Sequence, residues 1–218
     1  CGFLETISEA GAADGELLRR SLPLMSEQAR RMQRLVEDLL TLSRLESSHN
    51  PVREEEIDVP NLARTLYHDA LALSAGRHHI LLDLDCDDWL IAAEEELRSA
   101  LGNLVSNAIR YTPERGEVTI GWRRRGAEAV FSVRDTGIGI APHHIPRLTE
   151  RFYRVDRSRS RETGGTGLGL AIVKHVLNRH QGRLEITSEP GRGSTFSAVF
   201  PDERLVARDK REPIARSA

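Results

Sequence analysis

The strongest constraint on the fold is an apolar repeat of seven residues near the start of the chain. The residues that recur at this spacing are Leu18, Met25, Met32 and Leu39, with Leu35 and Leu42 at an intermediate position. Apolar residues with this period lie along one side of an α-helix, so the repeat predicts a helix over about 16–47, in which Pro23 leaves open a kink or a later start. Residues 1–10 are interpreted as the end of a preceding helix. Because two helices cannot enclose a core, residues 1–50 are expected to form a helical hairpin that dimerises.

The repeat ends where a second domain is expected to begin. Residues 51–57 combine a proline with an acidic run and are interpreted as a linker. The patterns that follow predict helices at 58–75, 94–111 and 168–180 and strands at 79–84, 89–92, 117–122, 129–134, 183–187 and 194–200. This mixture of helices and strand pairs predicts an α+β fold over 58–203, a two-layer α/β sandwich. Residues 204–218 are charged and aperiodic, and are expected to form a mobile tail.

Composition excludes several classes of protein. The chain has 31 Lys and Arg residues against 33 Asp and Glu residues, so no net positive field attracts it to nucleic acid or to an anionic membrane. Its two cysteines, Cys1 and Cys86, cannot build a disulfide framework or a cysteine-rich zinc site. No run of eighteen apolar residues is present, and the start of the chain lacks the pattern of a signal peptide. Because Cys1 is not an initiator Met, the chain is interpreted as the C-terminal piece of something longer.

Two amide side chains share one face of the helix predicted at 94–111. Asn103 and Asn107 are four residues apart, and Arg110 follows on the same face. An amide oxygen is a hard, neutral ligand that suits Mg²⁺ when phosphates also bind the ion, and an arginine can neutralise those phosphates. The alternative is an ordinary solvated helix face.

Asp135 stands at the end of an apolar strand and is followed by Gly137 and Gly139. These glycines allow a close approach to the backbone. A carboxylate at a strand end can accept a hydrogen bond from an exocyclic amine such as that of adenine. An Asp-x-Gly turn is also a common hairpin signal, so a plain turn is the alternative.

A glycine-rich segment leads directly into the last predicted helix. The segment Gly164–Gly169 exposes backbone N–H groups at a helix N-terminus, where anions bind. Its spacing matches neither a P-loop nor a dinucleotide fingerprint, which leaves a phosphate cradle of another kind or a flexible hinge. The aperiodic stretch before it contains several arginines, and Arg154 is the candidate phosphate ligand on a loop that can close as a lid.

Taken together, these motifs resemble the N, G1, F, G2 and G3 boxes of the sensor histidine kinases. The matching residues, in order, are Asn103 and Asn107, Asp135-x-Gly137-x-Gly139, Phe152-Tyr153-Arg154, Gly165-x-Gly167-x-Gly169 and Gly191-x-Gly193-Ser194-Thr195. The match extends over residues 1–200, and five ordered motifs are far more specific than any one of them. The segments GFLETI and LVEDLLTLSRLES are most similar to the phosphate-regulon type of sensor kinase.

The resemblance implies a Bergerat-type ATP-binding domain that works with ATP and Mg²⁺. It implies ATP contacts for Asn103, Asn107, Arg110, Tyr111, Asp135, Gly137, Gly139, Tyr153, Arg154, Gly165, Gly167, Leu168, Gly169 and Thr195. Asp135 would bind the adenine amine with Thr195 nearby, and Asn107 would bind Mg²⁺. The γ-phosphate would pass to a His on the dimerisation helix, for relay to an Asp of a response-regulator receiver domain.

The departure from the family pattern lies at the start of the chain. The phospho-accepting His should lie about ten residues before Cys1, so this chain by itself is not expected to autophosphorylate. The resemblance implies a cytoplasmic portion that forms a homodimer, binds no nucleic acid and is anchored in the inner membrane only through upstream segments.

Other functions stay open at this point. One is a different ATPase of the same superfamily, such as a gyrase-like or chaperone-like enzyme. Another is a non-catalytic module in which the bound nucleotide switches dimer geometry or regulator binding. A zinc site at His143 and His144 lacks further ligands.

Overall fold

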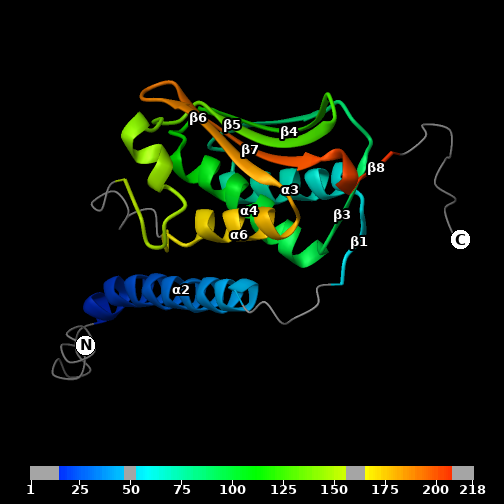
Figure 1. The fold of residues 1–218 in the computed structure, drawn as a ribbon. Helices are drawn as coiled ribbons and strands as arrows, with labels where there is room; N and C mark the ends of the chain where they lie inside the picture. The colour runs from blue at the N-terminus through cyan, green and yellow to red at the C-terminus, as the bar shows by residue number, and fades with distance from the viewer. Residues whose placement is uncertain (1–14, 47–52, 156–164, 208–218) are drawn as a thin grey trace, which may run out of the picture.

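A long helix lies beside an α/β domain in the computed structural model, which describes residues 15–46, 53–155 and 165–207 (Figure 1). The long helix, α2, spans Gly15–Glu46 and passes through Pro23 without a break. It confirms the helix predicted at 16–47. The preceding helix and the turn of the predicted hairpin lie outside the described residues.

The centre of the domain is a mixed sheet with the strand order β2-β4-β5-β7-β6. Its strands are β2 (His79–Leu84), β4 (Glu117–Arg125), β5 (Glu128–Asp135), β6 (Arg183–Glu189) and β7 (Gly193–Pro201). Strands β2 and β4 are parallel, and the other neighbours are antiparallel. The two strand pairs predicted from sequence are therefore confirmed, each a few residues longer than expected.

One face of this sheet is covered by helices α3 (Val59–Ser74), α4 (Glu94–Tyr111) and α6 (Gly169–Arg179), as Figure 1 shows. Alternate strand residues point toward these helices, and the aromatic rings of Trp122 and Phe131 are fully buried between the layers. Helix α3 begins where expected, because the Asp58 carboxylate accepts a hydrogen bond from the Asn61 N–H at 2.9 Å. The predicted two-layer sandwich is confirmed.

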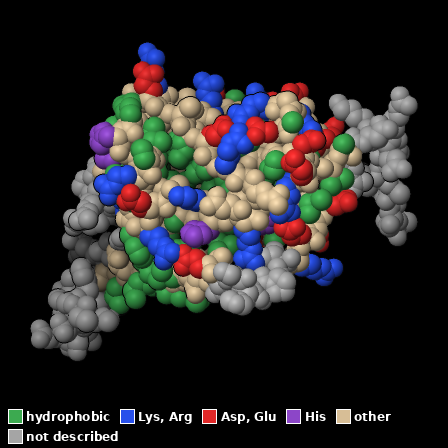
Figure 2. Space-filling view, in the orientation of Figure 1, with side chains coloured by type: hydrophobic (Ala, Val, Ile, Leu, Met, Phe, Trp, Pro, Cys, Tyr) green, Lys and Arg blue, Asp and Glu red, His purple; other side chains and the backbone are tan. Residues whose placement is uncertain are grey.

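The opposite face of the sheet carries paired charges. Arg125 and Arg183 each contact both Glu128 and Glu185, for example over 2.9 Å between Arg125 and Glu185. These guanidinium groups, that of Arg183 above all, lower the pKa of Glu128 to about 2. Figure 2 shows acidic and basic side chains gathered together over the strands at the top of the molecule. This face is therefore suited to contact with solvent and not to packing against a second layer of helices.

A second, smaller sheet corrects two sequence predictions. It contains β1 (Glu55–Ile57), β3 (Trp89–Ala92) and β8 (Leu205–Val206), in the order β1-β3-β8. The linker predicted at 51–57 therefore ends in a strand, and the tail predicted at 204–218 begins with one. Both strands are too short to show an alternation of apolar and polar residues in the sequence. Each forms only because β3 supplies its hydrogen-bonding partner.

Helix α2 packs against the domain through the end that precedes the linker. Leu42 is only 2% exposed and belongs to the core, and Leu45 packs against it. Leu42 was expected to face partner helices of the hairpin, but it contacts the domain instead, where α2 runs beside α6 (Figure 1). In contrast, Met32 is 69% exposed and Leu39 is 40% exposed.

No helix among the described residues is long and apolar enough to cross a bilayer.

Candidate functional site

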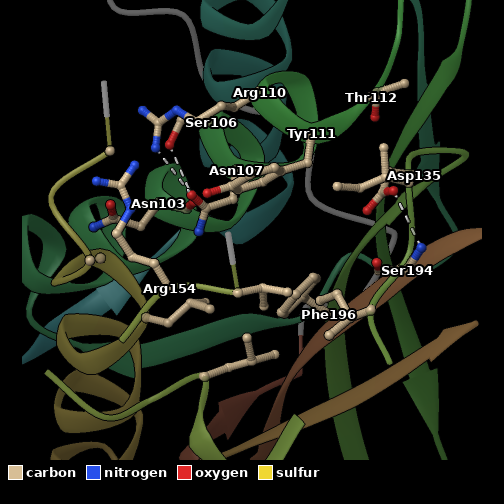
Figure 3. A pocket seen from close by; sticks show the side chains of 18 of the residues that line it. Asn103, Ser106, Asn107, Arg110, Tyr111, Thr112, Asp135, Arg154, Ser194 and Phe196 are labelled. Carbon is tan, nitrogen blue, oxygen red and sulfur yellow. Dashed lines mark hydrogen bonds between the residues drawn. The ribbon is translucent and has the colours of Figure 1, made fainter. Parts of the chain in front are cut away.

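A cavity of about 610 Å³ opens between the helical layer and one end of the sheet (Figure 3). Of the residues expected from sequence, the cavity is lined by Asn103, Asn107, Arg110, Tyr111, Asp135, Gly139, Tyr153, Arg154, Gly165, Gly167 and Gly169. These residues come from α4, from the end of β5 and the turn after it, from the loop that follows η1, and from the glycine-rich segment that leads into α6. A volume of this size is typical of sites for small molecules and cofactors.

Asp135 is the last residue of β5 and is 5% exposed. Its Oδ1 atom accepts hydrogen bonds from the N–H groups of Gly137 at 2.8 Å and Ser194 at 3.3 Å, the second of which Figure 3 marks. Burial raises the pKa of the carboxyl group, and these two hydrogen bonds partly oppose that rise. Because both bonds from the described residues go to Oδ1, the second oxygen can accept a hydrogen bond from a ligand.

Several apolar side chains line the same cavity as this carboxylate. They are Leu73, Ile138, Ile140, Leu148 and Phe196, and all of them line the cavity. A flat, apolar ring with one exposed amine fits this environment, because its faces would contact hydrocarbon while the amine donates to Asp135.

Gly137 does not line the cavity, so the structure does not place it with the other residues predicted for the ligand. A Cβ atom at Gly137 would lie 2.5 Å from the Tyr111 carbonyl oxygen, and one at Gly139, where φ is +66°, would collide with the Glu189 carbonyl. The close approach predicted at both glycines is therefore made by the protein's own backbone. This approach fixes the turn after Asp135 against the β6–β7 connection.

Thr195 also lies outside the cavity, whereas its neighbours Ser194 and Phe196 line it. In the β5–β7 pairing Asp135 lies opposite Ser194, whereas Thr195 lies opposite Arg134. Successive side chains of a strand point to opposite faces, so Ser194 and Phe196 line the cavity and Thr195 does not. Side chains alternate along β7, so the sequence would predict that Ser194 and Phe196 share a face, once the pairing of β7 with Asp135 is known.

The predicted polar face of α4 is confirmed. Asn103 and Asn107 point into the cavity together with Arg110 (Figure 3). The Asn103 amide nitrogen donates to the Ser99 carbonyl at 3.0 Å, and its oxygen lies beside Gly169 at the start of α6. The Arg110 guanidinium donates to the Asn107 amide oxygen at 3.5 Å. Both amide oxygens therefore face the same end of the cavity.

This end of the cavity is rich in positive charge. Burial lowers the pKa of Arg110, and the nearby charges of Arg34 and Arg154 lower it further. A Cβ atom at Gly165 would lie 3.1 Å from one Arg110 nitrogen and 3.6 Å from one Arg154 nitrogen, so both guanidinium groups lie close to this glycine. Such a cluster of cations beside a glycine-rich segment is typical of phosphate sites.

The glycine-rich segment acts through its backbone. Gly167 has a φ of +78°, and a Cβ atom there would lie 2.9 Å from Phe152. Leu168 was expected at the ligand, but its side chain is fully buried in the core and does not line the cavity. An apolar side chain at the first turn anchors α6, while Gly169 leaves room for the Asn103 amide oxygen, which a Cβ atom there would approach to 2.7 Å.

Tyr153 reaches the cavity from the loop beside the short 3₁₀ helix η1 (Pro142–Arg147). Its hydroxyl group lies 2.6 Å from His144 Nδ1, and the Arg147 guanidinium lies over its ring at 4.3 Å. These contacts hold the Tyr153 side chain against η1.

Among the described residues of the cavity wall that sequence analysis missed, Arg34 and Asp38 are the charged ones. Both belong to α2, which was assigned to the dimerisation hairpin. Their charge alone gave no signal, because charged residues are normal on a solvated helix face.

The residues present fit a magnesium ion that is shared with phosphates. The described part of the chain contains no group of three or more His, Cys, Asp or Glu residues that could hold a metal ion. The Asn103 and Asn107 amide oxygens can supply one or two ligands, and Mg²⁺ usually takes the rest from phosphates and water.

Two family models match this chain. Residues 92–204 match the model described as histidine kinase-, DNA gyrase B-, and HSP90-like ATPase. Residues 2–48 match the His Kinase A (phospho-acceptor) domain. The first match covers most of the residues that line the cavity, and the second covers the long helix.

Similar proteins agree with these matches. The phosphate regulon sensor protein PhoR of Pseudomonas aeruginosa is 50% identical over 97% of this chain and 48% of its own length. The sensor-like histidine kinase SenX3 of Mycobacterium tuberculosis is 39% identical over 95% of this chain and 52% of its own length. The chain thus spans about half the length of these curated relatives.

Among solved structures, full-length ShkA in complex with AMPPNP has a TM-score of 0.73 and 26% identity, over 87% of this chain and 40% of that one.

The similarity to PhoR confirms the resemblance to the phosphate-regulon type that was predicted from two short segments.

Proposed function

Since this chain belongs to the histidine kinase-, DNA gyrase B- and HSP90-like ATPases and carries a His Kinase A domain ahead of the ATPase, we propose that it is the catalytic part of a two-component sensor histidine kinase. It binds Mg-ATP and directs the γ-phosphate to a His of the dimerisation hairpin. The observation that carries this proposal is one cavity that joins a buried carboxylate in an apolar pocket to a cluster of arginines and amide oxygens.

The apolar end of the cavity selects the base. Asp135 accepts a hydrogen bond from the adenine amine, and Ile138 and Phe196 contact the faces of the ring. The rigid turn held by Gly139 keeps this carboxylate in place before the ligand arrives, so little free energy is spent on ordering it.

The polar end holds the phosphates. Arg110, Arg154 and the N-terminal end of α6 neutralise and orient them, while Asn107, beside Asn103, offers its amide oxygen to Mg²⁺. Magnesium, when bound, supplies further charge neutralisation of the phosphate oxygens. Transfer to a His then needs only correct positioning and neutralised charge, which are the main contributions of a protein to phosphoryl transfer.

The other partners follow from the same proposal. The hairpin joins two copies of the chain, and the phosphoryl group passes on to an Asp of a response-regulator receiver domain. The chain is the cytoplasmic portion of a protein anchored in the inner membrane. Two relatives are named phosphate regulon sensor proteins, which supports a signalling role of this kind.

The base assignment is tested by Asp135→Asn. We expect this variant to bind ATP at least tenfold more weakly in a calorimetric titration, because an Asn cannot offer the same charged acceptor. Asp87→Asn, at an exposed position, is the matched control and should bind normally. Unchanged affinity in the Asp135 variant would refute the assignment.

The metal assignment is tested by Asn107→Ala. The variant should lose most of the magnesium dependence of ATP binding, because the amide oxygen is the ligand that the protein supplies. Titrations with and without Mg²⁺ measure this difference, and a retained dependence would contradict the role of Asn107.

Phosphoryl transfer itself separates the kinase from a non-catalytic switch. The whole chain is mixed with a separately supplied hairpin that bears a phospho-accepting His, together with γ-labelled ATP. Label on the hairpin supports the kinase, whereas tight ATP binding without transfer supports a nucleotide-switched module.

A further inference from the structure

Helix α2 contributes to the phosphate end of the cavity. Arg34 and Asp38 line the same wall as Arg110 and Arg154. Of the described residues that line the cavity, only Asp38 and Asp135 carry carboxylates, and Asp135 lies at the apolar end. Asp38 is therefore the one acidic group among the described residues at the end that is rich in arginines.

Asp38 accepts a hydrogen bond from a group that could also bind a phosphate. Its Oδ2 atom accepts a hydrogen bond of 2.6 Å from the Thr166 hydroxyl, in the middle of the glycine-rich segment. The same hydroxyl accepts a hydrogen bond from the Leu168 N–H at 3.2 Å, which links the carboxylate to the start of α6. A hydroxyl donor beside a helix N-terminus also suits a phosphate oxygen.

Asp38 also interacts with the charges of the neighbouring arginines. Partial burial raises the pKa of this carboxyl group, while the Thr166 hydrogen bond and the positive charges of Arg110 and Arg34 oppose the rise. Asp38 in turn raises the pKa of Arg110, against the effects of burial and of the neighbouring arginines. The carboxylate thus offsets part of the repulsion among the arginines.

Two further contacts hold α2 in this place. Leu42, one turn beyond Asp38, is buried in the core. Glu46, one turn further, forms an ion pair with Arg151, and its carboxylate lies 3.5 Å from His175 Nε2. All three contacts lie on one side of α2, because residues four apart share a helix face.

We propose that Asp38 occupies the place of nucleotide phosphate and latches α2 onto the ATP-binding domain until the phosphates of ATP displace it. This inference rests on the proposed function of the cavity. A carboxylate and a polyphosphate compete for the same donors and cations, so binding of ATP and docking of α2 oppose each other. Adenosine carries no phosphate and does not compete.

The test is a calorimetric titration of the whole chain with ATP and with adenosine. Asp38→Asn and Asp38→Ala should each bind ATP about fivefold more tightly than the wild type, with adenosine affinity unchanged. Glu37→Gln, which removes an exposed charge next to Asp38, is the matched control and should change ATP affinity less than twofold.

A second variant separates a latch from local charge repulsion. Glu46→Gln weakens the docking of α2 but does not touch the cavity, so it should also tighten ATP binding, by about twofold. If Glu46→Gln has no effect while the Asp38 variants bind ATP more tightly, charge repulsion alone explains the result and the latch is refuted.

Two other outcomes would overturn the inference about Asp38. Unchanged or weaker ATP binding in both Asp38 variants overturns the inference but leaves the proposed function intact, because the wild type still binds. A wild type that binds neither ATP nor adenosine overturns both. Circular dichroism melting curves show whether each variant is folded.

Discussion

Asp135 meets two opposed demands in one side chain. The ligand needs a carboxylate that is ionised and shielded from water, whereas the folded chain is less stable when it buries a charge. Two backbone N–H groups, of Gly137 and Ser194, only partly offset this burial, since the pKa remains raised. The residue is thus optimised for binding and not for stability.

This conflict predicts that Asp135→Asn stabilises the ligand-free chain. We expect a rise of about 1 kcal/mol in the free energy of unfolding at pH 7, because an amide keeps an acceptor for both N–H groups without the buried charge. A carboxyl group with a raised pKa in the folded state stabilises the fold below its unfolded pKa, and this contribution is lost as the pH rises through the folded pKa. The difference between variant and wild type should therefore shrink toward about pH 4.

Urea denaturation at a series of pH values measures this effect. Asp87→Asn, at an exposed position, should show no such pH dependence. A destabilised Asp135 variant at pH 7 would show that its hydrogen bonds outweigh the cost of burial.

At the scale of elements, the binding end of the sheet depends on the contact between the turn after β5 and the β6–β7 connection. The Gly191 N–H donates to the Ile138 carbonyl at 2.8 Å, and Gly139 lies against the Glu189 carbonyl. The contact sets the position of Asp135 relative to Ser194, so the two elements form one rigid wall of the cavity.

Two glycines in this contact should respond differently to substitution by alanine. Gly139→Ala should cost about 3 kcal/mol of stability, because its Cβ collides with the backbone in addition to the strain of a positive φ. Gly191→Ala has a similar φ of +78° but open space around the Cβ, and should cost about 1 kcal/mol. Urea denaturation of both variants tests the difference, and equal costs would show that strain alone acts.

Helix α2 uses different faces for different contacts. Asp38, Leu42 and Glu46 face the ATP-binding domain, whereas Met32 and Leu39 are exposed on another side. In Figure 2 hydrophobic side chains gather over α2 at the lower left of the molecule. The seven-residue repeat therefore predicted the helix correctly but assigned Leu42 to the wrong neighbour.

For the whole molecule, these exposed apolar residues predict a dimer that assembles independently of the cavity. Met32→Glu should convert the dimer to monomers, because it places a charge in the apolar row, and should leave ATP affinity unchanged within a factor of about two. Ser26→Glu adds the same charge at an exposed polar position and should remain dimeric. Light scattering after size exclusion gives the mass of each variant, and a dimeric Met32 variant would exclude this face as the interface.

The amino-acid sequence by itself determined the periodic elements and the chemistry of the cavity ends. Helices α3, α4 and α6 and the main strands follow from local patterns, because a period of two or 3.6 residues is a property of adjacent residues. The polar face of α4 follows from the same spacing. Asp135 and the glycine-rich segment could also be assigned, because each motif combines its residues within a few positions.

Tertiary structure alone decided which side chains meet across long separations. Strands β1 and β8 exist only because β3 lies between them, and Ser194 lines the cavity while Thr195 does not because pairing with β5 sets the register of β7. Asp38 reaches Thr166 from a helix 128 residues away in sequence. Such contacts depend on how distant segments pack, and local periodicity carries no information about that packing.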